Sequence, residues 1–302
     1  MQLGMIGLGR MGANMAARLQ AGGHAIVAFD RDPAAVAAAI AAGAAGAESL
    51  EALVARLETP RAVWIMVPAG QATEGTVQAL RPLLAPGDAI VDGGNSNYRD
   101  SVRRAAELAG DGIAFVDCGT SGGIWGRTEG YSLMIGGADE AVRRLRPIFE
   151  TLAPAADAGW GHVGPAGAGH FVKMVHNGIE YGLMQAYAEG FEILHRKSEF
   201  ELDLAAIGRI WERGSVVRSW LLELTTKALA ENPGMDGIAP WVSDSGEGRW
   251  TVAEAIDLDV PAPVITHALI ARLRSRSEEA FADRLLAAMR AQFGGHAVRK
   301  DG

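Results

Sequence analysis

The sequence predicts an α/β protein in which an N-terminal, doubly wound parallel sheet is followed by an all-α C-terminal domain. Over the first half of the chain, short β-branched and apolar runs alternate with helical stretches, and this alternation is typical of a parallel sheet with helices on both faces. From about residue 165 onward the apolar spacing is helical only. We therefore expect two domains, residues 1–164 and 165–302, close to the usual length of roughly 150 residues each.

Composition and charge exclude several classes of protein. The 302 residues are 49% hydrophobic with a net charge of −8, and Lys and Arg are dispersed, so no nucleic-acid partner is expected. Cys118 is the sole cysteine, which excludes an intramolecular disulfide and a multi-cysteine metal centre, and we expect no metal. We see neither a signal peptide nor an apolar run long enough to span a bilayer, so we expect no membrane association and a cytoplasmic location.

The first expected strand, Gln2–Gly7, leads into a glycine-rich turn and a helix at 13–20. A G-x-G-x-x-G pattern between a strand and a helix is the dinucleotide-binding fingerprint of Rossmann-type sheets. Its first glycine allows the tight turn, its second lets the backbone approach a pyrophosphate, and its third packs the helix against the strand. The helix N-terminus then holds the phosphates. The cofactor-binding candidates are Gly7, Leu8, Gly9, Arg10, Met11 and Gly12.

The second expected strand, His24–Phe29, ends at Asp30, which lies 18 residues after Gly12. A carboxylate at this place accepts hydrogen bonds from an adenosine ribose 2′-hydroxyl and repels a 2′-phosphate. Asp30 therefore predicts NAD as the cofactor, with NADP weaker, although the adjacent Arg31 would attract a phosphate. An alternative role for Asp30 is to cap the turn before the helix that is expected to begin at Pro33.

Three glycine-rich loops follow later strands of the predicted sheet. Strands are expected at 61–67, 88–91 and 113–116, and 131–136 and 155–160 are expected to extend the sheet. Ligands bind at the carboxyl ends of such strands, where the loops are Val67–Gly70, Asp92–Ser96 and Asp117–Gly123. Each loop alone could be an ordinary turn, but three on one edge favour a binding site, with Val67, Pro68, Ala69 and Asn95 as cofactor candidates. Cys118 lacks a matched His and Asn, so a nucleophilic role is not favoured.

The helical half begins with a segment at 169–185 that is apolar on every face but carries Lys173 and Glu180. A helix of this kind is normally buried, and charged side chains are rarely buried without partners. Lys173, Asn177 and Glu180 share one face, with His176 beside it, and the backbones of Lys173 and Glu180 lie roughly 10 Å apart. This spacing favours a base and an acid on either side of a substrate. The alternative is a surface helix whose charges are solvated.

Further helices are expected at 204–211, 215–229, 251–256 and 263–290.

Four segments together carry a resemblance to a known family. They are the G-L-G-R-M-G turn, Asp92-Gly93-Gly94-Asn95-Ser96, Ser121-Gly122-Gly123, and Lys173–Tyr181, which reads K-M-V-H-N-G-I-E-Y. Over nearly the whole chain, the sequence resembles decarboxylating 6-phosphogluconate dehydrogenases, and in particular their short bacterial form. The glycine turn is generic, whereas the H-N-G-I-E-Y segment is specific among related β-hydroxyacid dehydrogenases.

The resemblance implies roles for the site residues. Lys173 is matched to the base that takes the C3 hydroxyl proton while C3 gives its hydride to the nicotinamide, and Glu180 to the acid that protonates C1 after carbon dioxide leaves. His176 and Asn177 are matched to groups that orient substrate hydroxyls, and Asn95 to one that spans substrate and nicotinamide. The groups matched to the C1 carboxylate site are Ser121, Gly122 and Gly123.

The phosphate end is the part in which the chain departs from long members of the family. Tyr181 and Arg272 are matched to phosphate contacts, and Arg290 with His296 to a pair that reaches in from a neighbouring subunit, which implies a homo-oligomer, a dimer or a tetramer. Ser245 and Glu247 stand where long members have a phosphate-binding lysine and threonine. Arg249 is a possible substitute.

The leading hypothesis is an NAD-preferring oxidative decarboxylase of 6-phosphogluconate, acting in the pentose phosphate pathway and gluconate utilization. A dehydrogenase of a small 3-hydroxy acid such as 3-hydroxyisobutyrate would share the fold and the lysine but would not need Glu180 as an acid. A non-catalytic NAD-sensing protein is the alternative from another class, and a buried acid and base speak against it.

Overall fold

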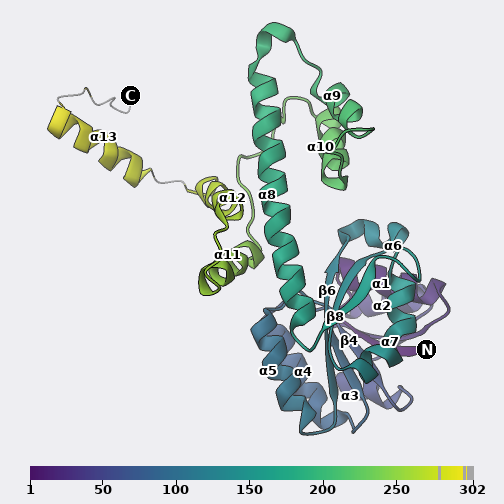
Figure 1. Cartoon of the computed structure of the whole chain (residues 1–302). Coiled ribbons are helices and arrows are strands. Elements are labelled where there is room, and N and C mark those ends of the chain that lie inside the picture. The colour runs from purple at the N-terminus through teal and green to yellow at the C-terminus, as the bar shows by residue number, and fades with distance from the viewer. Residues whose placement is uncertain (278–279, 295–296, 298–302) are drawn as a thin grey trace. The chain divides into compact units, whose positions relative to one another are not determined.

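The structure is a computed structural model that describes residues 1–277, 280–294 and 297 (Figure 1). It divides into two compact units, Met1–Asn177 and Gly178–Gly302. This division falls inside one long helix, α8 (Ala168–Arg196). The predicted domain boundary between residues 164 and 165 lies in the turn that precedes α8, and it stays a prediction.

The first unit is built on an eight-stranded sheet with the order β3-β2-β1-β4-β5-β6-β7-β8. The described neighbouring strands are parallel except for β6 and β7, which are antiparallel. The predicted doubly wound α/β class is confirmed, with one reversed pair that strand spacing alone did not predict. The strands are β1 (Gln2–Ile6), β2 (Ala25–Phe29), β3 (Ala45–Gly46), β4 (Ala62–Ile65), β5 (Ala89–Asp92), β6 (Ala114–Ser121), β7 (Ser132–Gly136) and β8 (Trp160–Gly164).

Helices cover both faces of this sheet, because its central strands are apolar on both sides. The helices are α1 (Arg10–Ala21), α2 (Pro33–Ala41), α3 (Leu50–Ala55), α4 (Gln71–Leu80), α5 (Tyr98–Ala109), α6 (Gly126–Glu129) and α7 (Asp139–Leu152). Along β4, Trp64 joins a core cluster with α1 and α7, whereas its neighbours Val63 and Ile65 join a second cluster with α3, α4 and α5. Successive strand residues point to opposite faces, so each face has its own core.

Two sequence expectations for this unit were wrong in position. The last strand begins at Trp160 rather than at Ala155, because residues 155–159 make a turn that ends at Gly159 with φ of 85°. The strand expected at 113–116 instead runs on to Ser121, since its small residues pair with β7. The two-residue strand β3 is too short to show a sequence period.

The second unit contains no strand in its described residues. Its elements after α8 are the 3-10 turn η3 (Ser198–Phe200) and the helices α9 (Leu204–Trp211), α10 (Trp220–Glu231), α11 (Glu247–Asp257), α12 (Pro263–Arg274) and α13 (Phe281–Gly294). The predicted all-α character is confirmed. The single helix expected at 263–290 is two helices, and α12 ends where Ser275 Oγ donates to the carbonyl of Arg272 at 2.8 Å.

Helix α8 is less buried than its apolar sequence predicts. Met174 and Tyr181 are buried, but Ile179 is 53% exposed and Leu183 is 44% exposed. The expectation of a helix buried on every face is therefore wrong for the single chain, because only part of its surface is covered. None of the described helices combines the length and the apolar character that crossing a membrane requires.

Candidate active site

The glycine-rich turn has the geometry that a dinucleotide pyrophosphate requires. Gly7 has φ of 90°, and a Cβ on it would lie 2.4 Å from the carbonyl oxygen of Met66. A Cβ on Gly12 would lie 1.9 Å from the carbonyl oxygen of Gly7, so α1 packs directly on the turn. A Cβ on Gly9 would meet nothing within 4 Å, which leaves open space beside the N-terminus of α1. These residues fit a bound dinucleotide.

Asp30 lies at the end of β2 and holds the same turn. Its Oδ2 accepts a hydrogen bond from the N–H of Leu8 at 2.6 Å, and its Oδ1 accepts one from the N–H of Asp32 at 2.8 Å. Asp32, rather than Asp30, caps α2, because its side chain accepts from the N–H of Ala34. Arg31 is exposed. The structure thus brings Asp30 to the glycine-rich turn, as the ribose hypothesis requires.

The loops after β4 and β5 lie against each other. A Cβ on Gly94 would lie 3.1 Å from the carbonyl oxygen of Val67, so only a glycine allows this approach without a shift. Pro68 and Ala69 are exposed, and Thr73 Oγ1 donates to the carbonyl of Pro68 at 3.0 Å. Asn95 is exposed between the buried Gly94 and Ser96. The candidate side chain therefore faces outward from a fixed loop.

The third loop follows β6. Gly122 and Gly123 have φ of 128° and 52°, conformations that a residue with a side chain rarely adopts. Ser121 and Gly122 are half-buried, and Gly123 is exposed. Cys118 is fully buried, and burial raises the pKa of its thiol far above its ordinary value. The thiol stays protonated, which agrees with the expectation that Cys118 is not a nucleophile.

Lys173 is buried within the first unit, where its helix approaches β6 closely. A Cβ on Gly119 would lie 2.4 Å from Lys173 Cβ, so a glycine on β6 makes room for the lysine stem. The ammonium group of Lys173 donates to Asn177 Oδ1, and His176 Nδ1 lies 3.1 Å from the same oxygen. Lys173 is 7% exposed and Asn177 8%. Three of the four predicted catalytic residues therefore form one hydrogen-bonded cluster.

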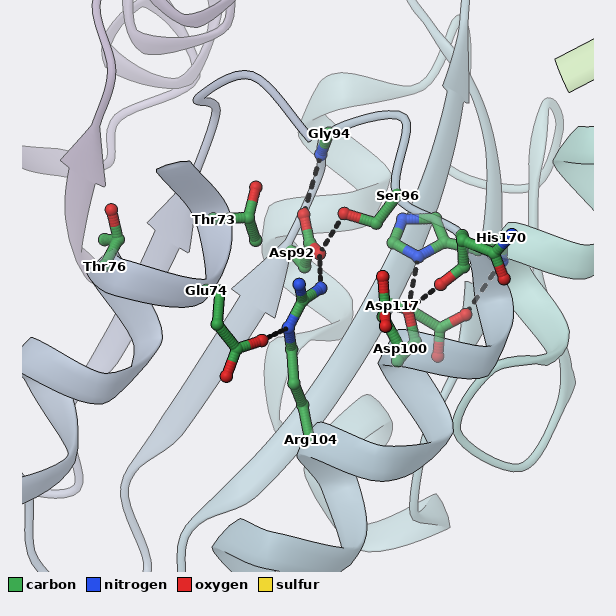
Figure 2. A network of polar contacts seen from close by, with 12 residues as sticks. Thr73, Glu74, Thr76, Asp92, Gly94, Ser96, Asp100, Arg104, Asp117 and His170 are labelled. Carbon is green, nitrogen blue, oxygen red and sulfur yellow. Dashed lines mark hydrogen bonds and ion pairs between the residues drawn. The ribbon is translucent and has the colours of Figure 1, made fainter. Parts of the chain in front are cut away.

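Sequence reasoning missed the buried carboxylate that anchors this helix. Asp117, on β6, accepts hydrogen bonds from the N–H groups of Gly167 at 2.6 Å and His170 at 2.8 Å (Figure 2). These N–H groups are among those that a helix start leaves without helical partners. His170 Nδ1 lies 2.7 Å from Ser101 Oγ on α5. A signal was present, since Asp117 directly follows the apolar Phe115 and Val116 and opens the predicted Asp117–Gly123 loop.

Glu180 and Tyr181 lie on the part of α8 that belongs to the second unit. Glu180 is half-buried. The guanidinium carbon of Arg272 lies 3.6 Å from the centre of the Tyr181 ring, and its Nη1 donates to the carbonyl of Ser243 at 3.2 Å. The two predicted phosphate contacts, Tyr181 and Arg272, are thus brought together.

Asp244 organises the charges around Tyr181, and sequence reasoning did not single it out. The Arg249 Nε donates to Asp244 Oδ2 at 2.5 Å, and Arg276 Nη2 lies 3.5 Å from it. Burial acts to raise the pKa of Asp244, but hydrogen bonds from Arg249 and the Gly246 N–H outweigh it, and the pKa is lowered. Glu247, expected near the phosphate, is buried at the start of α11.

The remaining predicted residues lie in the last helix or beyond the described part. Arg290 is exposed on α13. His296 lies outside the described residues. Among the residues that the structure describes, no group of three or more His, Cys, Asp or Glu side chains is arranged to hold a metal ion.

Comparisons with known proteins match both units. Residues 2–161 match the family model for the NAD binding domain of 6-phosphogluconate dehydrogenase, and residues 169–301 match that for the C-terminal domain of 6-phosphogluconate dehydrogenase. A protein of Haloferax volcanii named 6-phosphogluconate dehydrogenase, NAD(+)-dependent, decarboxylating is 47% identical, and the match covers 100% of both chains.

Solved structures share the fold. The 6-phosphogluconate dehydrogenase of Plasmodium falciparum matches with a TM-score of 0.84 and 29% identity, over 100% of this chain and 66% of that one. The 3-hydroxyisobutyrate dehydrogenase of Mycobacterium tuberculosis matches with a TM-score of 0.74 over 92% of this chain and 94% of that one, but its 24% identity supports the fold alone. From the two family models and the full-length relative together, the chain belongs to the 6-phosphogluconate dehydrogenase family.

Proposed function

We propose that the protein oxidises and decarboxylates 6-phospho-D-gluconate to ribulose 5-phosphate and carbon dioxide, with reduction of NAD. The observation that carries this proposal is the hydrogen-bonded cluster near the start of α8, in which Lys173 and Asn177 are buried and His176 is half-buried, in a segment that continues to Glu180. A base and an acid on one helix suit a reaction that needs both a proton acceptor and, later, a proton donor.

The glycine-rich turn and Asp30 are the groups that would hold NAD. The open space beside Gly9 and the N-terminus of α1 suit the pyrophosphate, and Asp30 suits an unphosphorylated ribose. Bound NAD supplies a hydride acceptor. Asp30 would also repel the 2′-phosphate of NADP, so we propose a preference for NAD, in keeping with the name of the Haloferax relative. Val67, Pro68 and Ala69 would line the nicotinamide end.

Lys173 is the proposed base for the oxidation step. It takes the proton of the C3 hydroxyl as C3 gives up its hydrogen with two electrons, so C3 becomes a ketone. Lys173 is buried and bonded to Asn177, which fixes the position of its amine beside the site. Asn177 and His176 orient the substrate hydroxyls beside it.

Glu180 is the proposed acid for the second half of the reaction. The β-keto acid loses its carboxylate as carbon dioxide, and the two electrons of the broken bond stay on the carbon that becomes C1 of the product. Glu180 gives that carbon a proton. Ser121, Gly122 and Gly123 would hold the carboxylate before it leaves, and Asn95 would contact both the substrate and the cofactor.

The phosphate of the substrate is assigned to the second unit. Tyr181 and Arg272 are in contact there, with Arg249 nearby on Asp244. Arg290 and His296 of a neighbouring subunit would complete this end, so we propose a homo-oligomer, a dimer or a tetramer. We also propose a cytoplasmic enzyme that serves the pentose phosphate pathway and gluconate utilization.

One assay panel tests the proposal. Purified protein is offered NAD or NADP together with 6-phosphogluconate, gluconate or 3-hydroxyisobutyrate, and reduced cofactor and carbon dioxide are followed together. We expect equal amounts of both products with 6-phosphogluconate and NAD. Reduced cofactor without carbon dioxide would indicate a 3-hydroxy acid dehydrogenase, and no turnover of 6-phosphogluconate would rule the proposal out.

A further inference from the structure

Helix α5 carries an arginine, Arg104, whose side chain is buried inside the sheet unit. Arg104 is 1% exposed and is among the largest fully buried side chains of the described residues. A buried ion pair is often no more stable than apolar side chains of the same size, because removing the charges from water is costly. The fold alone therefore gives little reason for an arginine here, which directs attention to what Arg104 contacts.

Arg104 bonds to helix α4, which follows the candidate loop after β4, and to the end of strand β5, which precedes the next candidate loop. Its Nε donates to Glu74 Oε2 on α4 at 3.0 Å, and its Nη1 donates to Asp92 Oδ2 at the end of β5 at 3.4 Å (Figure 2). A hydrogen bond from Arg103 is the main cause that lowers the pKa of Glu74 to about 2, and hydrogen bonds from Gln78 and Arg104 lower it further. Burial acts in the opposite direction but is outweighed. Glu74 is therefore an anion at neutral pH and a lasting partner for Arg104.

Asp92 extends the contact to both sides of Asn95. Asp92 Oδ1 accepts from the N–H of Gly94 at 3.1 Å, and Asp92 Oδ2 accepts from Ser96 Oγ at 2.7 Å. Asp92 is fully buried, whereas Asn95 is exposed. One buried carboxylate thus holds both Gly94 and Ser96, as Figure 2 shows, and these two residues flank Asn95 in the sequence.

The contact of Arg104 with Glu74 leads to the loop after β4. Glu74 lies in the first turn of α4, next to Thr73, which donates to the carbonyl of Pro68 at 3.0 Å. The two loops also touch directly, since Gly94 packs against the carbonyl oxygen of Val67. Arg104 therefore ties together α4, which begins at the first loop, and Asp92, from which the second loop starts.

We propose that Arg104 and Asp92 are positioning residues that hold the loops after β4 and β5 in register, so that Asn95 meets substrate and nicotinamide in one fixed arrangement. Neither residue touches the reacting atoms. The inference rests on the proposed function for the role of Asn95, and it adds the residues that fix the position of the Asn95 loop. A loop displaced by about 1 Å can cost on the order of 100-fold in rate.

The same strand supplies a matched control at its opposite end. Just before β5 begins, Asp88 is buried, pairs with Arg61 Nη1 at 3.0 Å and accepts from the N–H groups of Arg61 and Ala85. Asp88 and Asp92 are therefore alike in residue type, in burial and in pairing with an arginine, although Arg61 is 22% exposed and Arg104 is 1% exposed. Only Asp92 lies at the carboxyl edge, where the candidate loops are.

The experiment compares Asp92→Asn with Asp88→Asn, using melting temperature, kcat and KM for 6-phosphogluconate, and the Kd for NADH from fluorescence titration. We expect both variants to melt at a lower temperature. For Asp92→Asn alone we expect kcat to fall roughly 10- to 100-fold and the Kd for NADH to rise several-fold. If the two variants lose melting temperature alike and both keep kcat and Kd within two-fold, Asp92 is a stability residue and the proposal is wrong.

A second pair of variants tests the proposal in case Asp92→Asn does not fold. Arg104→Lys keeps the charge but cannot span both carboxylates with one planar group, and Arg61→Lys is its control. Arg104→Lys should show the same loss of kcat and rise in the Kd for NADH, and Arg61→Lys should not. If the unaltered protein does not turn over 6-phosphogluconate, the proposed function fails, but the Kd for NADH still decides whether Arg104 sets the loops.

Discussion

The two compact units hold their candidate residues in opposite ways. In the sheet unit the polar groups are buried and matched to specific partners, as with Asp117 at the start of α8 and Asp92 under the Asn95 loop. In the helical unit Arg249 and Arg276 are partly exposed and share one carboxylate, Asp244. The difference shows that the sheet unit fixes its loops and the start of α8 through buried carboxylates, whereas in the helical unit one carboxylate pairs with two arginines near the surface.

Helix α8 belongs to both units, so the comparison can be made along one element. Lys173 lies in the sheet unit and Glu180 in the helical unit. We expect the largest losses of kcat at the two groups of α8 that take part in the chemistry, Lys173 and Glu180, and an effect on substrate affinity alone at an exposed arginine of the helical unit. The following variants test this order, from the largest expected effect to the smallest.

Lys173→Met should remove the base while keeping the apolar stem, and we expect kcat to fall by at least about 1,000-fold, within the range of general acid–base catalysis. The Kd for NADH should change little. Lys197→Met is the control, because Lys197 is exposed and pairs with Glu199. Near-normal turnover in Lys173→Met would remove it as the base.

Glu180→Gln should keep the shape and hydrogen-bonding capacity of the side chain but remove the proton donor. We expect steady-state kcat to fall on the order of 100-fold, while a first turnover of reduced cofactor persists in rapid mixing. Glu189→Gln, on the same helix and exposed, is the control. An unchanged turnover number would contradict the assignment of Glu180 as acid.

Asp30→Ala should weaken discrimination between cofactors. We expect the ratio of kcat/KM for NAD to that for NADP to fall roughly 10-fold. The variant loses the hydrogen bond to the ribose 2′-hydroxyl of NAD, and it no longer repels the 2′-phosphate of NADP. Asp32→Ala is the control, because it removes the cap of α2 and should cost about 1 kcal/mol of stability without changing the ratio. Equal ratios in wild type and Asp30→Ala would refute a ribose contact.

Arg290→Ala should give the smallest effect, because Arg290 is exposed on α13. We expect KM for 6-phosphogluconate to rise about two- to five-fold, the value of one exposed ion pair, with kcat unchanged. Arg284→Ala, exposed on the same helix, should leave KM as it is. If both variants behave alike, the last helix does not reach a substrate phosphate.

The spacing of residues along the sequence was enough to predict the fold class, the glycine-rich turn and the face of α8 that carries Lys173. The G-x-G-x-x-G turn and the i, i+4 relation of Lys173 and Asn177 are local, so their geometry follows from residue spacing. The strand boundaries around Ala155 and Ser121 were missed, because they depend on a turn at Gly159 and on pairing with β7. The reversed direction of β7 depends on that pairing too.

Tertiary structure alone decided which polar groups support the candidate site. Asp117 is 50 residues from Gly167 in sequence, and Arg104 is 30 residues from Glu74. No local period connects such residues, because a hydrogen bond between them forms only after the strands and helices have packed. Local spacing determines which residues can do the chemistry, and long-range packing determines which buried partners hold them in place.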